Sequence, residues 1–393
     1  MSGRFRAAGE VAIVGFAHSP IQRVADDPLG VLTLRTIREA VADAGLDMTA
    51  IDGFTTGALF PSSGGRPLRD GIEIVTSDWI VDQLHVQPRW LCGFQGLGQI
   101  CGSVILATEA IASGAADYVV VHRAMYNPPG RYHANPMTHA SGGDQWSAPH
   151  GFWGPPTHMA LTYTEYQQRY GATREHMATV VVGGRAAGSQ NPWSHWYDRP
   201  LTRDEYLSAR MIAEPMSMLD CDIPVTGVGA FVLTSKERAR DLPHKPVYVA
   251  GYAQGRSQSV NGVPPWRLDD VEEGGRAVGR ILWENTGLGP DEIDVPQVYD
   301  AFSPFVYLWL EALGFCERGE GFEYVQDPGT SPGLTFRTGG GAIGNGRMHG
   351  VPQMLECYLQ LAGRAGDRQL AGVETGIACQ AAPSVGGVVA YST

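Results

Sequence analysis

The sequence predicts an α/β fold built from two duplicated halves. Short apolar runs typical of buried strands alternate with segments whose apolar residues recur at helical spacing. A helix end with Gly-Leu, then Ile-Asp five residues later and then a strand, occurs in residues 43–53 and again in residues 285–295. The order glycines, helix, glycine and strand also recurs, in residues 95–124 and 344–381. We therefore expect repeated β–α–β units whose parallel sheets are covered by helices.

The first half begins with a strand at residues 10–17 and a helix at residues 28–45. The strand is a short apolar run, and the helix carries Leu29, Leu32 and Ile37 at helical spacing. The further elements expected in this half are strands at 53–60, 116–121 and 227–234, and helices at 99–113, 158–170, 173–187 and 202–210. Residues 90–98 form the segment that leads into the helix at 99–113.

Residues 124–157 interrupt this pattern. Prolines, glycines, histidines and aromatic side chains crowd together there without periodicity. Because so long an irregular stretch in a compact fold is usually functional, we interpret it as a lid or one wall of a binding pocket. The aromatic side chains suit a bulky apolar group; packing of a long insertion or of an interface explains them as well.

A charged stretch at residues 238–245, broken by Pro243, marks a junction between the halves. It divides the chain into an N-terminal half, residues 1–240, and a C-terminal half, residues 245–393. The elements expected in the second half are strands at 247–253, 295–298, 372–379 and 387–392, and helices at 274–286, after Pro304 and at 352–362.

Composition and charge exclude several classes of protein. The net charge of −12 and the pI near 5.4 give no electrostatic support for binding nucleic acid or anionic lipid. No apolar run reaches membrane length and no charged and apolar leader follows Met1, so we expect a cytoplasmic protein without a membrane segment. The six cysteines lack CxxC and Cys/His ligand spacing, which predicts buried free thiols rather than disulfides or a metal site.

Two strand-to-helix junctions in the second half carry the candidate chemistry. Tyr299 and Asp300 lie where a strand gives way to a helix, and a glycine-rich loop brings Arg347 and His349 to the head of another helix. Active sites of α/β folds lie at strand ends of this kind. Taken singly, Tyr299 is typical of a core tyrosine and His349 of a helix cap. Together, at matching junctions, they indicate a site that handles protons.

The order of several short motifs resembles the thiolase superfamily, in its sterol-carrier or lipid-transfer branch. The motifs are Val11-Ala-Ile-Val-Gly, Gly45-Leu with Ile51-Asp-Gly, Gly171-Ala-Thr, Asn191-Pro, Leu219-Asp-Cys-Asp and Tyr299-Asp-Ala-Phe-Ser. The resemblance covers nearly the whole chain. It implies a thiolase-like five-layered αβαβα fold made of two halves, and a homodimer.

The departures from that family concern its cysteines. A thiolase carries a nucleophilic cysteine at the start of a helix, and this position falls near Leu97; Cys101 lies about one turn further on, away from the helix N-terminus. Without a thiolate at that N-terminus no acyl-enzyme forms. The family's C-terminal cysteine loop is matched poorly, because Cys379 precedes Gln-Ala-Ala-Pro rather than glycines.

A chain of this kind, with Tyr299-Asp in place of the family's His-Asp, resembles the steroid side-chain aldolases. The resemblance implies Tyr299, Asp300 and His349 as catalytic groups, whereas Arg347 stands where those aldolases carry a second tyrosine and Ala301 replaces a histidine. It also implies a small OB-fold partner with a zinc ribbon in a two-plus-two heterotetramer. Zinc is then expected only in that partner, no cofactor in this chain, and CoA as part of the substrate.

Retro-aldol cleavage of a β-hydroxyacyl-CoA needs a base for the hydroxyl proton, a group that stabilises the enolate and an acid, but no covalent intermediate. Because the pKa of a free tyrosine is about 10, Tyr299 acts as the base only if a cation such as Arg347 lowers that pKa; otherwise it donates a hydrogen bond. We assign the hydroxyl proton to Tyr299 and the enolate to His349. Asp300 then orients its neighbours, and Arg347 tunes Tyr299 or contacts the thioester.

Three functions follow from these patterns. The preferred one is a carbon–carbon lyase that cleaves a steroid side-chain CoA thioester to a ketone or aldehyde plus propionyl-CoA or acetyl-CoA. The second is a thiolase-type acyltransferase with Cys101 or Cys379 as nucleophile, and the third is a non-catalytic lipid-binding subunit. Arg185 and Arg199 are candidate contacts for CoA phosphates, or else ordinary surface arginines.

Overall fold

The computed structural model describes residues 4–57, 75–94, 96, 98–127, 145–152, 154–255, 267–326 and 338–393. The strands of its main sheet are β1 (Val11–His18), β2 (Gly53–Thr56), β3 (Trp90–Gly93), β4 (Tyr118–Tyr126), β7 (Thr226–Ser235), β8 (Val247–Gln254), β9 (Val295–Gln297), β10 (Thr375–Gln380) and β11 (Gly387–Ser392). Their order is β3-β2-β4-β7-β1-β8-β11-β10-β9, so strands β1 to β7 fill one end and β8 to β11 the other. The division of the chain near residues 240–245 stays a prediction, which this order favours.

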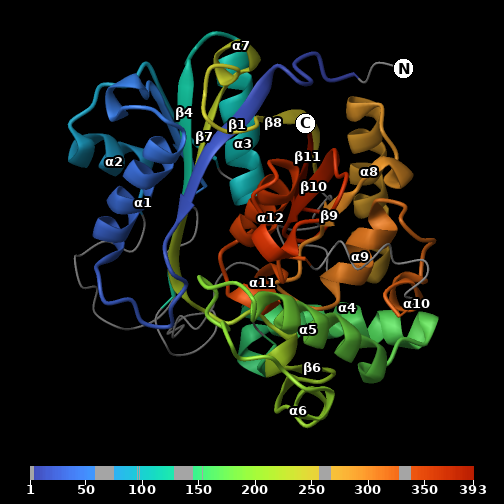
Figure 1. Ribbon diagram of the computed structural model, residues 1–393. Coiled ribbons are helices and arrows are strands. Elements are labelled where there is room, and N and C mark those ends of the chain that lie inside the picture. Colours follow the sequence, from blue (N-terminus) through green and yellow to red (C-terminus); the bar gives the residue numbers. More distant parts are fainter. Residues whose placement is uncertain are drawn as a thin grey trace.

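Helices pack on the outer faces of the two groups of strands, β1 to β7 and β8 to β11, and also lie between the two groups. These helices are α1 (Leu29–Asp43), α2 (Ser77–Leu84), α3 (Gln99–Ala112), α8 (Leu268–Thr286), α9 (Phe305–Ala312) and α12 (Val351–Leu361). Helices α1 and α2 lie outside β1 to β7, α3 and α12 lie in the middle, and α8 and α9 lie outside β8 to β11 (Figure 1). Three clusters of buried apolar side chains fill the interfaces: one under α1 and α2, one around α3 and α12 that reaches the strands on both sides, and one under α8 and α9. The predicted α/β fold with five layers is therefore confirmed.

The strands run in mixed directions, so the expectation of parallel sheets is wrong. Among the described strands, only β2 with β3 and β4, and β9 with β10, pair in parallel. The other neighbours in the main sheet are antiparallel. The connection between β10 and β11, residues 381–386, explains one such pair, because a parallel crossover needs roughly a dozen residues or more.

The irregular stretch is shorter than residues 124–157. Strand β4 continues to Tyr126, and the next long helix, α4, begins at Pro155. Residues 128–144 of the expected lid, and residues 58–60 of the expected second strand, lie outside the described residues. The lid therefore stays a prediction.

A mainly helical region, drawn in green in Figure 1, lies across one end of the layers. It consists of α4 (Pro155–Tyr170), α5 (Arg174–Gly188), α6 (Arg203–Leu207), β5 (Met211–Ala213) and β6 (Met216–Ser217). Helix α5 packs closely on α11 (Gly341–Asn345) because glycines face one another: a Cβ atom at Gly188 would overlap the carbonyl group of Gly344. This contact fixes α11, which borders the candidate site.

Substitution of Gly188 by Ala is expected to destabilise the protein by about 3 kcal/mol or more, because the added methyl group must push α5 away from α11. Gly184→Ala, one turn earlier on the same helix, is the matched control: its Cβ atom would lie 3.4 Å from the Gly340 carbonyl oxygen, an ordinary contact. Urea unfolding of both variants checks this. Equal stabilities would show that the glycine contact does not set the distance between the two helices.

Candidate active site

Tyr299 and Asp300 lie in the interior of the protein, directly after β9. Strand β9 ends at Gln297, and α9 begins at Phe305, as predicted from Pro304. Tyr299 is 4% exposed and Asp300 7% exposed. The ring of Tyr299 stacks on that of Phe305, with centroids 6.3 Å apart.

The carboxylate of Asp300 is bound to the first turn of α11. It accepts hydrogen bonds from the backbone N–H groups of Ala342 (2.6 Å) and Ile343 (3.2 Å) and from the side-chain amide of Gln353 (2.7 Å). Burial raises the pKa of Asp300 to about 7, although these donors act in the opposite direction. Asp300 thus ties the Tyr299 loop to α11.

The glycine-rich loop after α11 places Arg347 beside His349. The Arg347 Nε–H group lies 3.2 Å from His349 Nε2, and its Nη1 atom lies 3.4 Å from Asn127 Oδ1. The Arg347 backbone N–H donates to the carbonyl oxygen of Ile223 at 2.9 Å. His349 does not cap α12, because Gly350 precedes that helix and no side chain caps it.

The other ring nitrogen of His349, Nδ1, contacts two residues of the N-terminal half. Its Nδ1 atom lies 2.7 Å from Gln99 Oε1 and 3.0 Å from Arg123 Nη2. Arg347 and Arg123 can both only donate, and a neutral ring has one lone pair, so it accepts from one of them. We place this lone pair on Nε2, toward Arg347, and the proton on Nδ1, which donates to Gln99; the contact of Arg123 with Nδ1 is then a close approach rather than a hydrogen bond. These hydrogen bonds describe a neutral imidazole held at both nitrogens.

A third segment, residues 220–222, runs alongside the Tyr299 loop. The Asp222 backbone N–H donates to the carbonyl oxygen of Ala301 at 2.9 Å. The side-chain hydroxyls of Tyr206 and Ser303 both donate to Asp220 Oδ1, each at 2.7 Å. These bonds bring the carboxylate of Asp222, a buried residue, to the neighbourhood of Tyr299.

The phenol of Tyr299 is neutral in this environment. Burial raises the pKa of Tyr299 well above 10, and the charge of Asp222 raises it further, whereas Arg347 and Arg123 act to lower it. The cations therefore do not turn Tyr299 into a phenolate. Of the two roles weighed for this residue, the structure favours the hydrogen-bond donor.

Neither thiol proposed as a nucleophile is suited to that role. The expectation that Cys101 lies away from the helix N-terminus is wrong, because it lies within the first turn of α3, which begins at Gln99 as predicted. It is nevertheless 1% exposed, and burial raises its pKa to about 12. Gln380 Oε1 accepts the N–H groups of Ile100 (2.7 Å) and Cys101 (3.3 Å), so a side chain already caps this helix end. Burial also raises the pKa of Cys379 well above its ordinary value. The position near Leu97 lies outside the described residues.

Iodoacetamide is therefore expected to label Cys92, which is partly exposed, well before Cys101 and Cys379, both of which are buried in the native protein. A Cys101→Ala variant should keep most of its turnover. Peptide mass spectrometry after timed labelling, together with assays of the variant, checks both statements. Fast labelling of Cys101 with parallel loss of turnover would restore it as the nucleophile.

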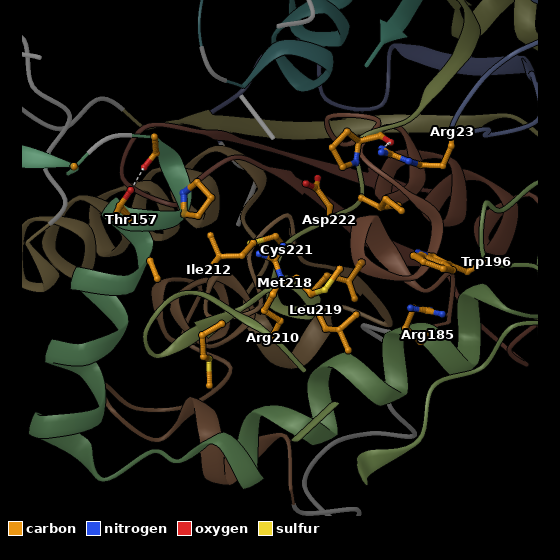
Figure 2. Close-up of a pocket in the computed structure, with 18 residues that line it drawn as sticks. Arg23, Thr157, Arg185, Trp196, Arg210, Ile212, Met218, Leu219, Cys221 and Asp222 are labelled. Atoms are coloured by element: carbon orange, nitrogen blue, oxygen red, sulfur yellow. Dashed lines mark hydrogen bonds between the residues drawn. The ribbon is translucent and has the colours of Figure 1, made fainter. Parts of the chain in front are cut away.

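A pocket of about 600 Å³ borders the segment that carries Asp222 (Figure 2). Its lining residues include Asp222 and Ile343, which are directly bonded to the Tyr299 loop, and the cationic side chains of Arg23, Arg185 and Arg210. The Arg185 guanidinium stacks on Trp196, 3.6 Å from the ring centroid. Arg199 does not line the described pocket. The wall is thus basic at several points and carries one carboxylate near Tyr299.

Sequence reasoning had missed Asp222, Gln99 and Arg123 as site residues. Arg123 carried a signal, because a charged residue inside the apolar run of β4 must be buried on one face of the sheet or the other. Asp222 stood within a motif that supported the family resemblance, but nothing local linked it to Tyr299. Within the described ranges, no group of His, Cys, Asp or Glu side chains is placed to hold a metal ion, and no helix is long and apolar enough to cross a bilayer.

Solved structures place this fold among the thiolases. An Ltp2-ChsH2(DUF35) aldolase superposes with a TM-score of 0.83 at 27% identity, covering 98% of both chains. Human mitochondrial 3-ketoacyl-CoA thiolase in complex with CoA superposes with a TM-score of 0.67 at 14% identity, again covering 98% of both chains, a likeness of fold. Residues 268–393 match the family model described as thiolase C-terminal domain-like.

Two relatives named for their activity indicate the family within the thiolase superfamily to which the chain belongs. The 17-hydroxy-3-oxo-4-pregnene-20-carboxyl-CoA lyase of Mycobacterium tuberculosis is 33% identical over 380 residues, 93% of this chain and 95% of the relative. The steroid side-chain-cleaving aldolase of Thermomonospora curvata is 32% identical over 368 residues, 90% of this chain and 91% of the relative. The chain belongs to the thiolase superfamily, in its family of steroid side-chain-cleaving aldolases.

Proposed function

We propose that the protein is a carbon–carbon lyase that cleaves a β-hydroxyacyl-CoA thioester by a retro-aldol reaction without a cysteine nucleophile. The substrate is a steroid side-chain CoA thioester, and the products are a ketone or aldehyde and propionyl-CoA or acetyl-CoA. One observation carries the proposal: in a thiolase fold, both candidate thiols are buried and protonated, while a phenol, a carboxylate, a guanidinium and an imidazole converge. This set serves proton transfer and enolate stabilisation rather than acyl transfer.

The proton of the substrate hydroxyl passes to Asp222 through Tyr299. Asp222 exerts the largest electrostatic effect of any side chain on Tyr299 and lines the pocket, so it can act as the base while the neutral phenol bridges it to the hydroxyl. Loss of the proton breaks the bond between the hydroxyl-bearing carbon and the α-carbon of the thioester. Tyr299 then returns a proton to the α-carbon and recovers its own from Asp222.

Arg347 faces the thioester oxygen in this mechanism, and His349 positions it. His349 Nε2 accepts the Arg347 Nε–H group, so the ring orients the guanidinium rather than donating to the enolate itself. Asp300 holds the loop through α11. The roles of these residues are proposals, as is the contribution of Tyr299.

The basic pocket suits the phosphate groups of CoA. Arg23, Arg185 and Arg210 line it, and each offers donors for phosphate oxygens, so we place the CoA moiety here. Arg199, the other candidate for this contact, instead lies over Trp196 and donates to the carbonyl oxygen of His195.

An Arg210→Gln variant is expected to raise the KM for the CoA thioester about tenfold with little change in kcat, because it removes a charged donor that binds ground state and transition state alike. Arg203→Gln is the matched control, since that arginine is exposed on α6 and pairs with Glu175. Steady-state kinetics of both variants test the placement. If Arg210→Gln leaves the KM unchanged, the CoA phosphate groups do not bind at Arg210 and the placement of CoA in this pocket is wrong.

The proposal includes a partner. The similar structure is an Ltp2-ChsH2(DUF35) aldolase, and we propose a DUF35-type partner with an OB-fold and a zinc ribbon, which supplies the zinc, together with a homodimer of this chain in a two-plus-two assembly. A cytoplasmic location stays a prediction from the sequence.

The test is to incubate the purified protein, with and without a co-expressed DUF35 partner, with 17-hydroxy-3-oxo-4-pregnene-20-carboxyl-CoA and to identify products by mass spectrometry. A steroid ketone and propionyl-CoA, formed without added free CoA, are expected. Cleavage of a β-ketoacyl-CoA that requires free CoA, with the β-hydroxy thioester left intact, would support the acyltransferase. Binding without cleavage, in the presence of the partner, would support the lipid-binding subunit.

A further inference from the structure

Arg123 is a buried cation to which the described residues offer no carboxylate counterion. It lies on β4 and is 2% exposed. Its Nη2 atom lies 3.0 Å from His349 Nδ1 and its Nη1 atom 3.4 Å from the Ala124 carbonyl oxygen, while its Nε atom has no hydrogen-bond partner in the described part of the chain. No carboxylate there forms an ion pair with it. Burying a charge in this way is costly unless an anion compensates for it.

A second guanidinium lies on the opposite side of the same imidazole. Arg347 is 6% exposed and contacts His349 Nε2, so two arginines bracket one neutral ring. The two charges repel each other: burial, and next the charge of Arg347, lower the pKa of Arg123 to about 9. Both arginines also act electrostatically on Tyr299, which places the phenol, the ring and the two cations within one small volume.

We propose that Arg123 and Arg347 form a two-guanidinium anion site that receives the negative charge developing on the thioester oxygen. The inference deepens the proposed function and rests on it. When the carbon–carbon bond breaks, its electron pair becomes the double bond of the enolate and the carbonyl π pair moves to the oxygen. That oxygen carries the charge until a proton adds to the α-carbon and the carbonyl is restored. A buried cation pair that is already in place stabilises this charge without reorganisation.

Arg123 is therefore a specific donor to the enolate, and a site with Arg347 alone is insufficient. The probes for this are carboxymethyl-CoA, whose carboxylate imitates the charged enolate, and carbamoylmethyl-CoA, a neutral amide of the same shape. We compare the wild type with Arg123→Met, which keeps much of the volume, and with Arg123→Lys, which keeps the charge. Titration calorimetry of the complex with its partner gives the affinities, and circular dichroism confirms that each variant is folded.

The wild type is expected to bind carboxymethyl-CoA about tenfold or more tightly than carbamoylmethyl-CoA. Arg123→Met should abolish this preference while leaving the affinity for the amide nearly unchanged, and Arg123→Lys should restore part of it. An unchanged preference in Arg123→Met, or an equal loss of affinity for both probes, overturns the proposal. Because these are binding measurements, they stand even if the steroid substrate is not cleaved, so failure of the proposed function is recognised separately.

Discussion

Substitution of Tyr299 by Phe is expected to lower kcat by about a thousandfold, because it removes the hydroxyl that carries the proton between substrate and Asp222. The ring keeps its place, since it stacks on Phe305 and lies in the apolar core. The fold should therefore survive with little change in stability. Steady-state kinetics and thermal unfolding of the variant check both parts of this expectation.

Tyr391→Phe is the matched control for this experiment. Tyr391 is 1% exposed on β11, and its hydroxyl has no hydrogen-bond partner in the described part of the chain, so removing that hydroxyl should change neither turnover nor fold. A Tyr299→Phe variant that turns over as fast as Tyr391→Phe would remove Tyr299 from the mechanism. A variant that unfolds would mean that the phenol is a structural group.

Asp300 is expected to make the protein less stable as the pH rises from about 4 to about 7. In the native state its pKa is about 7, against an ordinary value of 3.8, so over this range the folded protein holds a proton that the unfolded chain has released. Since stability falls with pH wherever the native state binds more protons, Asp300 contributes a loss of about 4 kcal/mol at most across this window.

An Asp300→Asn variant isolates this contribution, because the amide has nearly the same shape but does not titrate. Unfolding free energies of both proteins are measured in urea between pH 4.5 and pH 8. This range covers most of the interval from about 4 to about 7 in which Asp300 is protonated in the native state but ionised in the unfolded chain. The stability of the wild type relative to the variant should fall as the pH rises through this range. If it stays flat instead, the N–H donors of Ala342 and Ile343 outweigh burial, and the carboxylate is ionised in the native state over this range.

The sequence predicted the longer elements of the fold well, because apolar periodicity is a local signal. Strand β1, helices α1, α3 and α5 and the start of α9 lie where the pattern placed them. Helix α11 was missed because five residues rich in glycine carry no periodicity; its position comes from the contact with α5. The direction of the strands was predicted wrongly because the duplication was read as a run of β–α–β units, although the short β10–β11 connection already required an antiparallel pair.

The candidate site also contains residues that local sequence could predict and residues that only the folded structure brings together. Tyr299 and Asp300 are neighbours in the chain, and so are Arg347 and His349, so the sequence could propose each pair. Asp222, Gln99 and Arg123 reach the site through the pairing of distant segments and the packing of α3 between the two ends of the sheet. The protonation of Tyr299 likewise depends on burial and on Asp222, which are properties of the folded chain.

The most direct test of the central claim is to run the cleavage in deuterium oxide, with the partner present and free CoA absent. A retro-aldol reaction that passes through an enolate predicts a steroid ketone and a propionyl-CoA that carries one deuterium at its α-carbon. Cleavage that begins only after free CoA is added, or a propionyl-CoA that carries no deuterium at its α-carbon, would contradict the account.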